Sequence, residues 1–105
     1  MPLSPAILEK ITELFKEAYP ISRDTTIYAE VVSGQSQIKG ITELRDALEH
    51  LNRAITTEDE ACALDNLTEA YEHLRRAGVE SIQRAATKLY SECLESIKTP
   101  SALEH

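Results

Sequence analysis

The feature that most constrains the fold is a helical pattern of apolar residues that keeps one phase from Glu58 to Ile97. Residues eighteen positions apart share one face of an α-helix after about five turns. Apolar residues form such pairs on both sides of Gly78, namely Leu64 with Ile82, Leu67 with Ala85, and Tyr71 with Leu89. The pattern therefore favours one helix over residues 58–97, roughly 60 Å long at about 1.5 Å per residue. The alternative is a break at Gly78, which would give a compact monomer of five helices.

A helix of that length would extend past the rest of so small a bundle and leave an apolar face uncovered. We expect a second copy of the chain, or another protein, to cover this face, with Leu67, Tyr71 and Leu89 in the interface. Arg75 lies near the middle of the same stripe, where a charged group is unusual unless it is paired or faces a ligand. Either its stem packs while its head reaches water, or it pairs with a carboxylate of another helix, or it belongs to the interface.

The first helix is bounded by two clear signals. Ser4 before Pro5 predicts a helix over residues 5–18, because the hydroxyl can cap free amides and proline fits the first helical position. Pro20 is expected to end this helix.

Capping and loop signals then divide the middle of the chain. Asp24 is expected to cap a short helix over residues 24–33, although β-branched residues in this segment also suit a strand. The polar, glycine-containing residues 34–40 predict a loop, and a helix over residues 41–55 follows. A capping box beginning at Thr57 starts the final helix. The predicted fold is all-α, a bundle of four helices or of five if the last one breaks.

Composition supports this fold class. The chain has 105 residues, 42% of them hydrophobic, with one Phe and no Trp. A core with so few large rings favours close packing of helices over a sheet sandwich. We therefore expect residues 1–102 to form a single domain, and the sequence of residues 103–105, Leu-Glu-His, is typical of the start of an expression tag.

The acidic net charge limits the kinds of partner that the chain is expected to bind. A formal net charge of −7 opposes nonspecific binding to nucleic acid or to anionic membranes, so we expect neither DNA nor a membrane as a partner. No apolar run approaches the roughly 20 residues that cross a bilayer, and the first residues lack a signal-peptide pattern. Cys62 and Cys93 are too few and too far apart for a disulfide framework. These features predict a cytoplasmic protein with free thiols.

In the segment from Arg45 to His50, a general acid or base lies close in sequence to a permanent cation. Such a pair could serve phosphoryl chemistry, with the guanidinium holding anionic oxygens and the imidazole moving a proton. On a single helix, however, the two residues lie roughly 140° apart. Asp46 and His50 do share a face, so a surface pair is the simpler interpretation.

Arg45, the polar Asp46 and His50 resemble the motif of ribonucleases in the HEPN superfamily of small all-helical proteins. The Ala-rich continuation of the last helix is similar to the long helices of that family. The resemblance implies a dimer that brings two motifs to one cleft without metal. Arg45 would then stabilise the transition-state charge, His50 would transfer a proton, and Asp46 would orient one of them. Some relatives have lost catalysis and bind RNA or nucleotides instead.

No metal or cofactor site is predicted. Glu-x-x-His pairs are the pattern of metal-binding bundles, but the residues three before His50 and His73 are both alanine. His73 lies opposite the apolar stripe and is expected to be a solvated surface residue. Phosphate-binding glycine loops and serine nucleophile elbows are also absent from the sequence.

Two functions of different classes therefore follow from the sequence. The first is a noncatalytic interaction module that forms a homodimer through the final helix or binds another protein. The second is a HEPN-like metal-independent ribonuclease, or an inactive relative that binds RNA, with Arg45, Asp46 and His50 as its site residues. The two differ in whether His50 has a chemical role.

Overall fold

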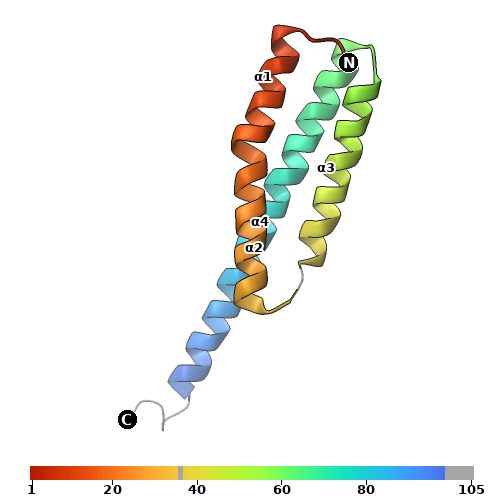
Figure 1. The fold of residues 1–105 in the computed structure, drawn as a ribbon. Coiled ribbons are helices and arrows are strands. Elements are labelled where there is room, and N and C mark those ends of the chain that lie inside the picture. Colours follow the sequence, from red (N-terminus) through yellow and green to blue (C-terminus); the bar gives the residue numbers. More distant parts are fainter. Residues whose placement is uncertain (36, 99–105) are drawn as a thin grey trace.

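The computed structural model describes residues 1–35 and 37–98 of the chain, and over these residues it contains three helical segments (Figure 1). In chain order, the elements are α1 (Pro5–Glu13), the π-helical turn η1 (Leu14–Ala18), α2 (Tyr19–Ser33), α3 (Ile38–Thr56) and α4 (Glu60–Lys98). The first three run into one another as one continuous helical segment. The described residues contain no strand, which confirms the all-α prediction, while the predicted count of four helices is wrong. The residues expected to be an expression tag, 103–105, lie outside the described part.

The first helix begins where the sequence predicts. The hydroxyl of Ser4 accepts a hydrogen bond from the N–H of Ile7 at 3.2 Å, and Pro5 occupies the first turn. The same hydroxyl donates to Oε1 of Glu60 at 2.6 Å, at the start of α4. Ser4 therefore both caps α1 and connects the beginnings of the first and last helices.

Pro20 does not end this helix, and the predicted separate helix over residues 24–33 is part of the same segment. A proline within a helix removes a hydrogen bond and clashes with the carbonyl four residues earlier. Here η1 widens the turn before Pro20, so that the N–H of Tyr19 reaches the carbonyl of Leu14, five residues back. The π-turn moves the backbone away from the proline ring, and the helix continues to Ser33.

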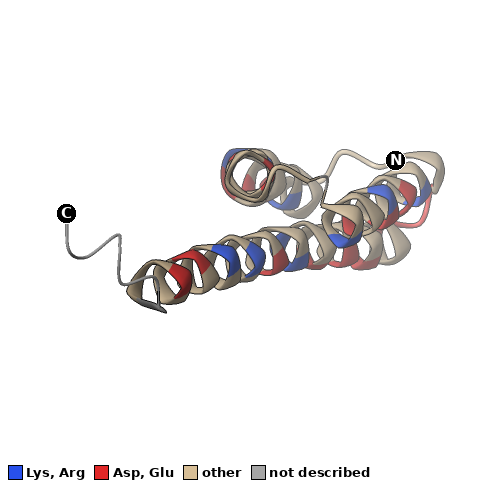
Figure 2. Cartoon of the chain, turned by 90° about the horizontal axis from the view of Figure 1, so that it is seen from below, with Lys and Arg blue, Asp and Glu red and all other residues tan. Residues whose placement is uncertain are grey.

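The α1–α2 segment and α3 both pack along α4, which lies between them (Figure 1). The charged residues of α4 from Glu60 to Glu72 are all acidic, and basic and acidic residues are interspersed from Arg75 onward (Figure 2). Two clusters of buried apolar side chains join the three segments: Leu14, Ala18, Ala47, Ala70 and Leu74 form one, and Ile7, Ala54, Ala63 and Leu67 form the other. Because many of these residues are alanine, the helix backbones can approach closely.

The prediction of one helix across Gly78 is confirmed, since α4 is continuous from Glu60 to Lys98. A Cβ atom placed on Gly78 would lie 3.4 Å from Oγ1 of Thr25 and 3.6 Å from the backbone Cα of Ser22. One turn further on, the hydroxyls of Thr26 and Ser81 are hydrogen-bonded at 3.1 Å. Gly78 therefore lies at a close contact of α4 with the α2 backbone, which explains a residue that otherwise weakens a helix interior.

The apolar spacing of Leu44, Leu48, Leu51 and Ile55 predicts that these four residues form the inner face of α3, but the helix buries other side chains more deeply. Ala47 and Ala54 face the core, whereas Leu48 is 66% exposed and Ile55 is exposed as well. The helix also begins at Ile38, a turn earlier than predicted, after Gly34 ends α2 in a left-handed conformation with φ of 68°. Small residues at the contact with α4 let the two helices approach, and the larger neighbours are turned outward.

The last turns of α4 project past the connection between α2 and α3 (Figure 1). We call residues 89–98 the overhang. Leu89, Tyr90 and Ile97 are exposed on it. Within the described part of the chain, no helix combines the length and apolar character needed to cross a membrane.

Candidate functional site

The structure separates the side chains of the Arg45–His50 motif. Arg45 is 75% exposed, and its Nη2 lies 3.7 Å from Oδ1 of the neighbouring Asp46. Both residues line a shallow surface hollow on α3 that does not include His50. His50 turns toward α4 instead, where its Nδ1 lies 2.9 Å from Oδ1 of Asn66. A single chain therefore does not bring Arg45 and His50 to one site.

His50 instead belongs to a polar cluster between α3 and α4. Its ring is stacked on that of His73, with centroids 5.2 Å apart and planes inclined by 19°. Nδ1 of His73 lies 2.6 Å from Oε2 of Glu43, and the two side chains are only 13% and 19% exposed. The prediction that His73 is a solvated surface residue is wrong, because α3 covers it.

The hydrogen bonds of the cluster assign the proton on each ring. A carboxylate only accepts, so the short contact with Glu43 makes Nδ1 of His73 a donor. The amide nitrogen of Asn66 donates to the carbonyl of Cys62 at 2.9 Å, which leaves the amide oxygen facing His50. Nδ1 of His50 is therefore also a donor. In both neutral rings, the lone pair then lies on Nε2.

Arg76 lies at the edge of this cluster. Its Nη1 is 4.0 Å from Oε2 of Glu43 and 3.5 Å from Nδ1 of His73. The second contact cannot be a hydrogen bond while Nδ1 donates to Glu43, so the ion pair with the carboxylate is the interaction we assign to Arg76. The guanidinium then balances the charge of Glu43 on the Nδ1 side of the ring.

Glu69 completes the cluster on its exposed side. One ligand atom each from His50, Glu69 and His73 lie within 4.8 Å of one another, and this group of side chains could hold a metal ion. Glu69 and His73 are four residues apart on α4, so they share a face. Among the described residues, no hydrogen bond or ion pair involves the Glu69 carboxylate.

The sequence holds a signal for this cluster in the spacing of its residues around the connection between α3 and α4. Two antiparallel helices joined by a short turn bring together residues that lie equally far from the turn. Glu43 with His73, and His50 with Asn66, are such pairs around the residues that connect α3 to α4. A search for Glu-x-x-His within single helices could not find residues that meet across two helices.

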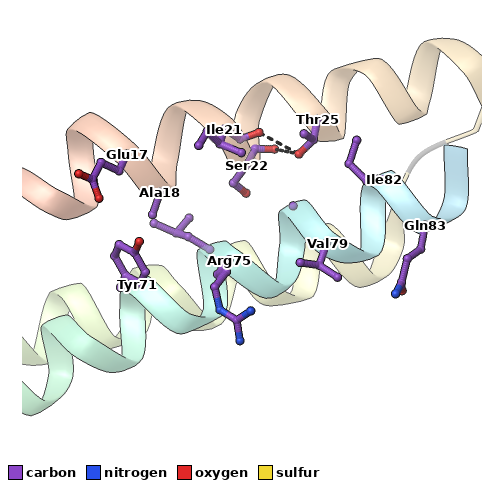
Figure 3. A pocket seen from close by; sticks show the side chains of 12 residues that line it. Glu17, Ala18, Ile21, Ser22, Thr25, Tyr71, Arg75, Val79, Ile82 and Gln83 are labelled. Atoms are coloured by element: carbon purple, nitrogen blue, oxygen red, sulfur yellow. Dashed lines mark hydrogen bonds between the residues drawn. The ribbon is translucent and has the colours of Figure 1, made fainter. Parts of the chain in front are cut away.

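On its other side, α4 forms an apolar groove of about 530 Å³ with α2 (Figure 3). Ile21 of α2 faces Val79 and Ile82 of α4 across it. Tyr71 and Arg75 line the end nearer the start of α4. Arg75 is exposed, and its guanidinium pairs with Glu72 of the same helix at 3.1 Å. The structure thus gives Arg75 a partner on its own helix and none on another, among the described residues.

The residues expected to form an interface divide into two kinds. Tyr71 and Arg75 line the groove, and Leu89, which is 42% exposed, lies on the overhang. Leu67 is only 2% exposed and packs within the core, so it is not available to a partner in this conformation. The expectation of an interface role for Leu67 is therefore corrected to a structural one.

The groove and the overhang share one apolar row on α4. The members of the row are spaced three or four residues apart, and none of them is charged. They are Val79, Ile82, Ala86, Leu89, Cys93 and Ile97. All of them are exposed. Such spacing is that of a seam along which two helices pair. We call this row the α4 seam.

Comparisons of the chain with protein-family models, with curated proteins and with solved structures found no match. The resemblance to the HEPN superfamily therefore stays a prediction.

Proposed function

We propose that this chain is a noncatalytic helical interaction module that forms a homodimer by antiparallel pairing of α4 with α4 of a second copy. The observation that carries this proposal is the α4 seam, which is exposed both along the groove and on the overhang. Exposed apolar surface of this extent is a feature of interaction sites, because isolated soluble domains seldom leave it open to water.

The occupant of the groove is the partner's overhang. The groove extends from Tyr71 to Ile82 on α4, a distance of about 17 Å at 1.5 Å per residue. The overhang is three turns long, about 15 Å, so the two lengths match. In an antiparallel pair that crosses near residue 84, Leu89 of one copy would lie against Val79 of the other, and Ile97 against Tyr71.

The same crossing makes the contact self-complementary. Each copy gives its overhang and receives the other's, so the interface is isologous and closes at two subunits. Ala86, a small residue, lies near the centre of the crossing and faces Ile82 of the other copy. The members of the seam from Val79 to Ile97 are uncharged, so the row itself brings no like charges together there. Arg75, at the far end, is already neutralised by Glu72.

Substitution of Leu89 tests this proposal. Leu89→Glu removes an apolar contact twice in each dimer, about 3 kcal/mol or more, which corresponds to roughly 100-fold weaker association. Leu89 lies outside both core clusters, so the variant should keep its helical circular dichroism. Sedimentation equilibrium should give the mass of two chains for the wild type and of one chain for the variant at the same concentration.

Leu48→Glu is the matched control, because Leu48 is a similarly exposed leucine on α3, away from the seam. We expect this variant to remain a dimer. A monomeric wild type, or a Leu89→Glu variant that keeps the mass of two chains, would overturn the proposal. Dissociation by Leu48→Glu alone would assign the interface to α3 and would equally contradict pairing through α4.

The ribonuclease alternative requires two chains to bring Arg45 of one to His50 of the other. No contact of the described residues favours it, since Arg45 is turned to solvent and His50 is bound to Asn66. Cleavage of a mixed-sequence RNA in EDTA by the wild type, and not by His50→Ala, is the result that would establish it.

A further inference from the structure

We infer that His50, Glu69 and His73 form a binding site for a divalent transition metal ion, with Zn²⁺ as the best fit. The three side chains come from two helices, and one ligand atom of each lies within 4.8 Å of the others. Two imidazoles and one carboxylate are donors that zinc accepts in sites with three protein ligands. Oxygen-only ions such as Mg²⁺ and Ca²⁺ are disfavoured by the two nitrogen donors.

The protonation of the two rings suits a metal. Glu43 holds the Nδ1 proton of His73, and Asn66 holds that of His50. A metal-bound histidine commonly donates its other ring N–H to a carboxylate or to an oxygen of a neighbouring group, and this fixes the tautomer and the direction of the ring. Both rings therefore already carry the outer hydrogen bond of a ligand and present Nε2 as the free donor. This arrangement distinguishes the cluster from a chance encounter of two histidines.

The charges around the cluster allow a cation. Arg76 pairs with Glu43, and both contact His73 at Nδ1, so the guanidinium lies on the side of the ring away from Nε2. The carboxylate of Glu69, which has no partner among the described residues, supplies a negative charge on the open side. An incoming ion would thus meet two lone pairs and one free carboxylate.

Binding requires a small closure of the cluster. Bonds of about 2.0–2.2 Å in a tetrahedral site place ligand atoms roughly 3.3–3.6 Å apart. The present separations of up to 4.8 Å must therefore shorten by up to about 1.2–1.5 Å. Glu69 is exposed and has a flexible side chain, so it can supply much of this movement, while the two rings tilt toward a common point. A fourth ligand position stays open to water.

The site would join α3 to α4, because His50 belongs to α3, whereas Glu69 and His73 belong to α4. Metal that binds only the folded arrangement raises the stability of that arrangement. This inference does not depend on dimer formation, since the cluster lies between α3 and α4 and none of its three ligands lines the groove.

Titration calorimetry with ZnCl₂ tests the site, with protein purified without a polyhistidine tag. We expect one Zn²⁺ per chain and a higher unfolding temperature when zinc is present. His50→Ala and His73→Ala should each weaken binding by about 100-fold, and Glu69→Gln by about tenfold, by analogy with the cost of disturbing metal ligands and their supports. Because Glu69 is exposed, its variant tests the site without disturbing the fold.

Two controls separate this site from other donors. Glu92→Gln changes an equally exposed carboxylate of α4 that pairs with Lys88, and it should leave zinc affinity unchanged. The second control concerns sulfur, because Cys62 is the thiol beside Asn66 and Cys62→Ser removes it. We expect no sulfur ligand, so the Co²⁺-loaded wild type should lack thiolate charge-transfer absorption. Failure of the wild type to bind Zn²⁺ at about 100 µM, or unchanged affinity in Glu69→Gln and both histidine variants, would overturn the inference.

Discussion

The two sides of α4 hold their neighbours by different means. Toward α3, the contacts include paired polar side chains, with His50 on Asn66 and His73 on Glu43. Toward α2, the contact is made mainly by small residues, with Gly78 against the α2 backbone and an apolar groove beside it, and it includes one buried pair of hydroxyls, Thr26 with Ser81. Polar pairs specify one register because a shift leaves buried groups without partners, whereas an apolar surface accepts any partner of suitable shape. The α3 side of α4 is therefore held in register by several polar pairs, and the α2 side by one, beside a groove lined by apolar side chains.

The largest effect is expected at Leu67, where the two sides meet in the core. Leu67→Glu would bury a carboxylate in the cluster formed with Ile7, Ala54 and Ala63. An unpaired buried charge costs far more than the usual 0.5–3 kcal/mol of a point mutation, so we expect the chain to unfold at room temperature. Circular dichroism would show loss of helix. Retention of full helicity would mean that Leu67 can turn to the surface, contrary to its present burial.

An intermediate effect is expected at the small-residue contact with α2. Gly78→Leu would force a side chain into the space held by Thr25 and the Ser22 backbone, and overpacking of this kind costs about 1–3 kcal/mol. Chemical denaturation should show the loss. Gly78→Ala is the control: its Cβ would meet Thr25 at the edge of ordinary contact, and alanine improves helix propensity by about 1 kcal/mol. Equal stability of the leucine and alanine variants would show that α2 does not approach α4 as closely as described.

The smallest effect on stability is expected on the α3 side of α4, at the polar pair of Glu43 with His73. Glu43→Gln keeps the shape of the side chain but replaces a charged hydrogen bond to His73 by a neutral one, at a cost of about 1 kcal/mol. Denaturation in EDTA would measure this without a metal contribution. The matched variant Glu49→Gln, whose carboxylate pairs with Arg53 on the surface, should change stability by less than about 0.5 kcal/mol. An equal effect of both variants would show that the α3 side is not held by its buried polar pairs.

Local signals in the sequence predicted the parts of the fold that depend on local interactions. Ser4 and Pro5 start the first helix because capping acts over a few residues. The shared phase on both sides of Gly78 predicted one helix because neighbouring turns must agree on a face. Pro20 misled the prediction because a π-turn can absorb a proline, and no pattern among nearby residues announces such a turn.

The candidate sites were predicted unequally for a related reason. Tyr71 and Arg75 belong to one helix, so the apolar stripe was enough to predict that they lie near one another on one face, while the groove that they line also depends on α2. The cluster of His50 with His73 depends on the register of α3 against α4, which a periodic pattern in either helix alone does not contain. The side chains that α3 exposes, including Leu48, likewise depend on how closely Ala47 lets it approach α4.

The π-turn at Leu14–Ala18 also determines how the residues before it are oriented about the helix axis relative to the residues after it. An extra residue in a helix rotates everything downstream by about 100° relative to what precedes it. Ile7, before the turn, and Ala29, after it, would lie about 40° apart on an uninterrupted helix and lie about 60° apart with the extra residue, so both still face the interior. A shortening of the turn by one residue, together with replacement of Pro20, would straighten the helix without shortening α2. It would also turn Ile21 away from the groove. The apolar surface of the groove therefore depends on a π-turn that lies two turns or less before Ile21 in the chain.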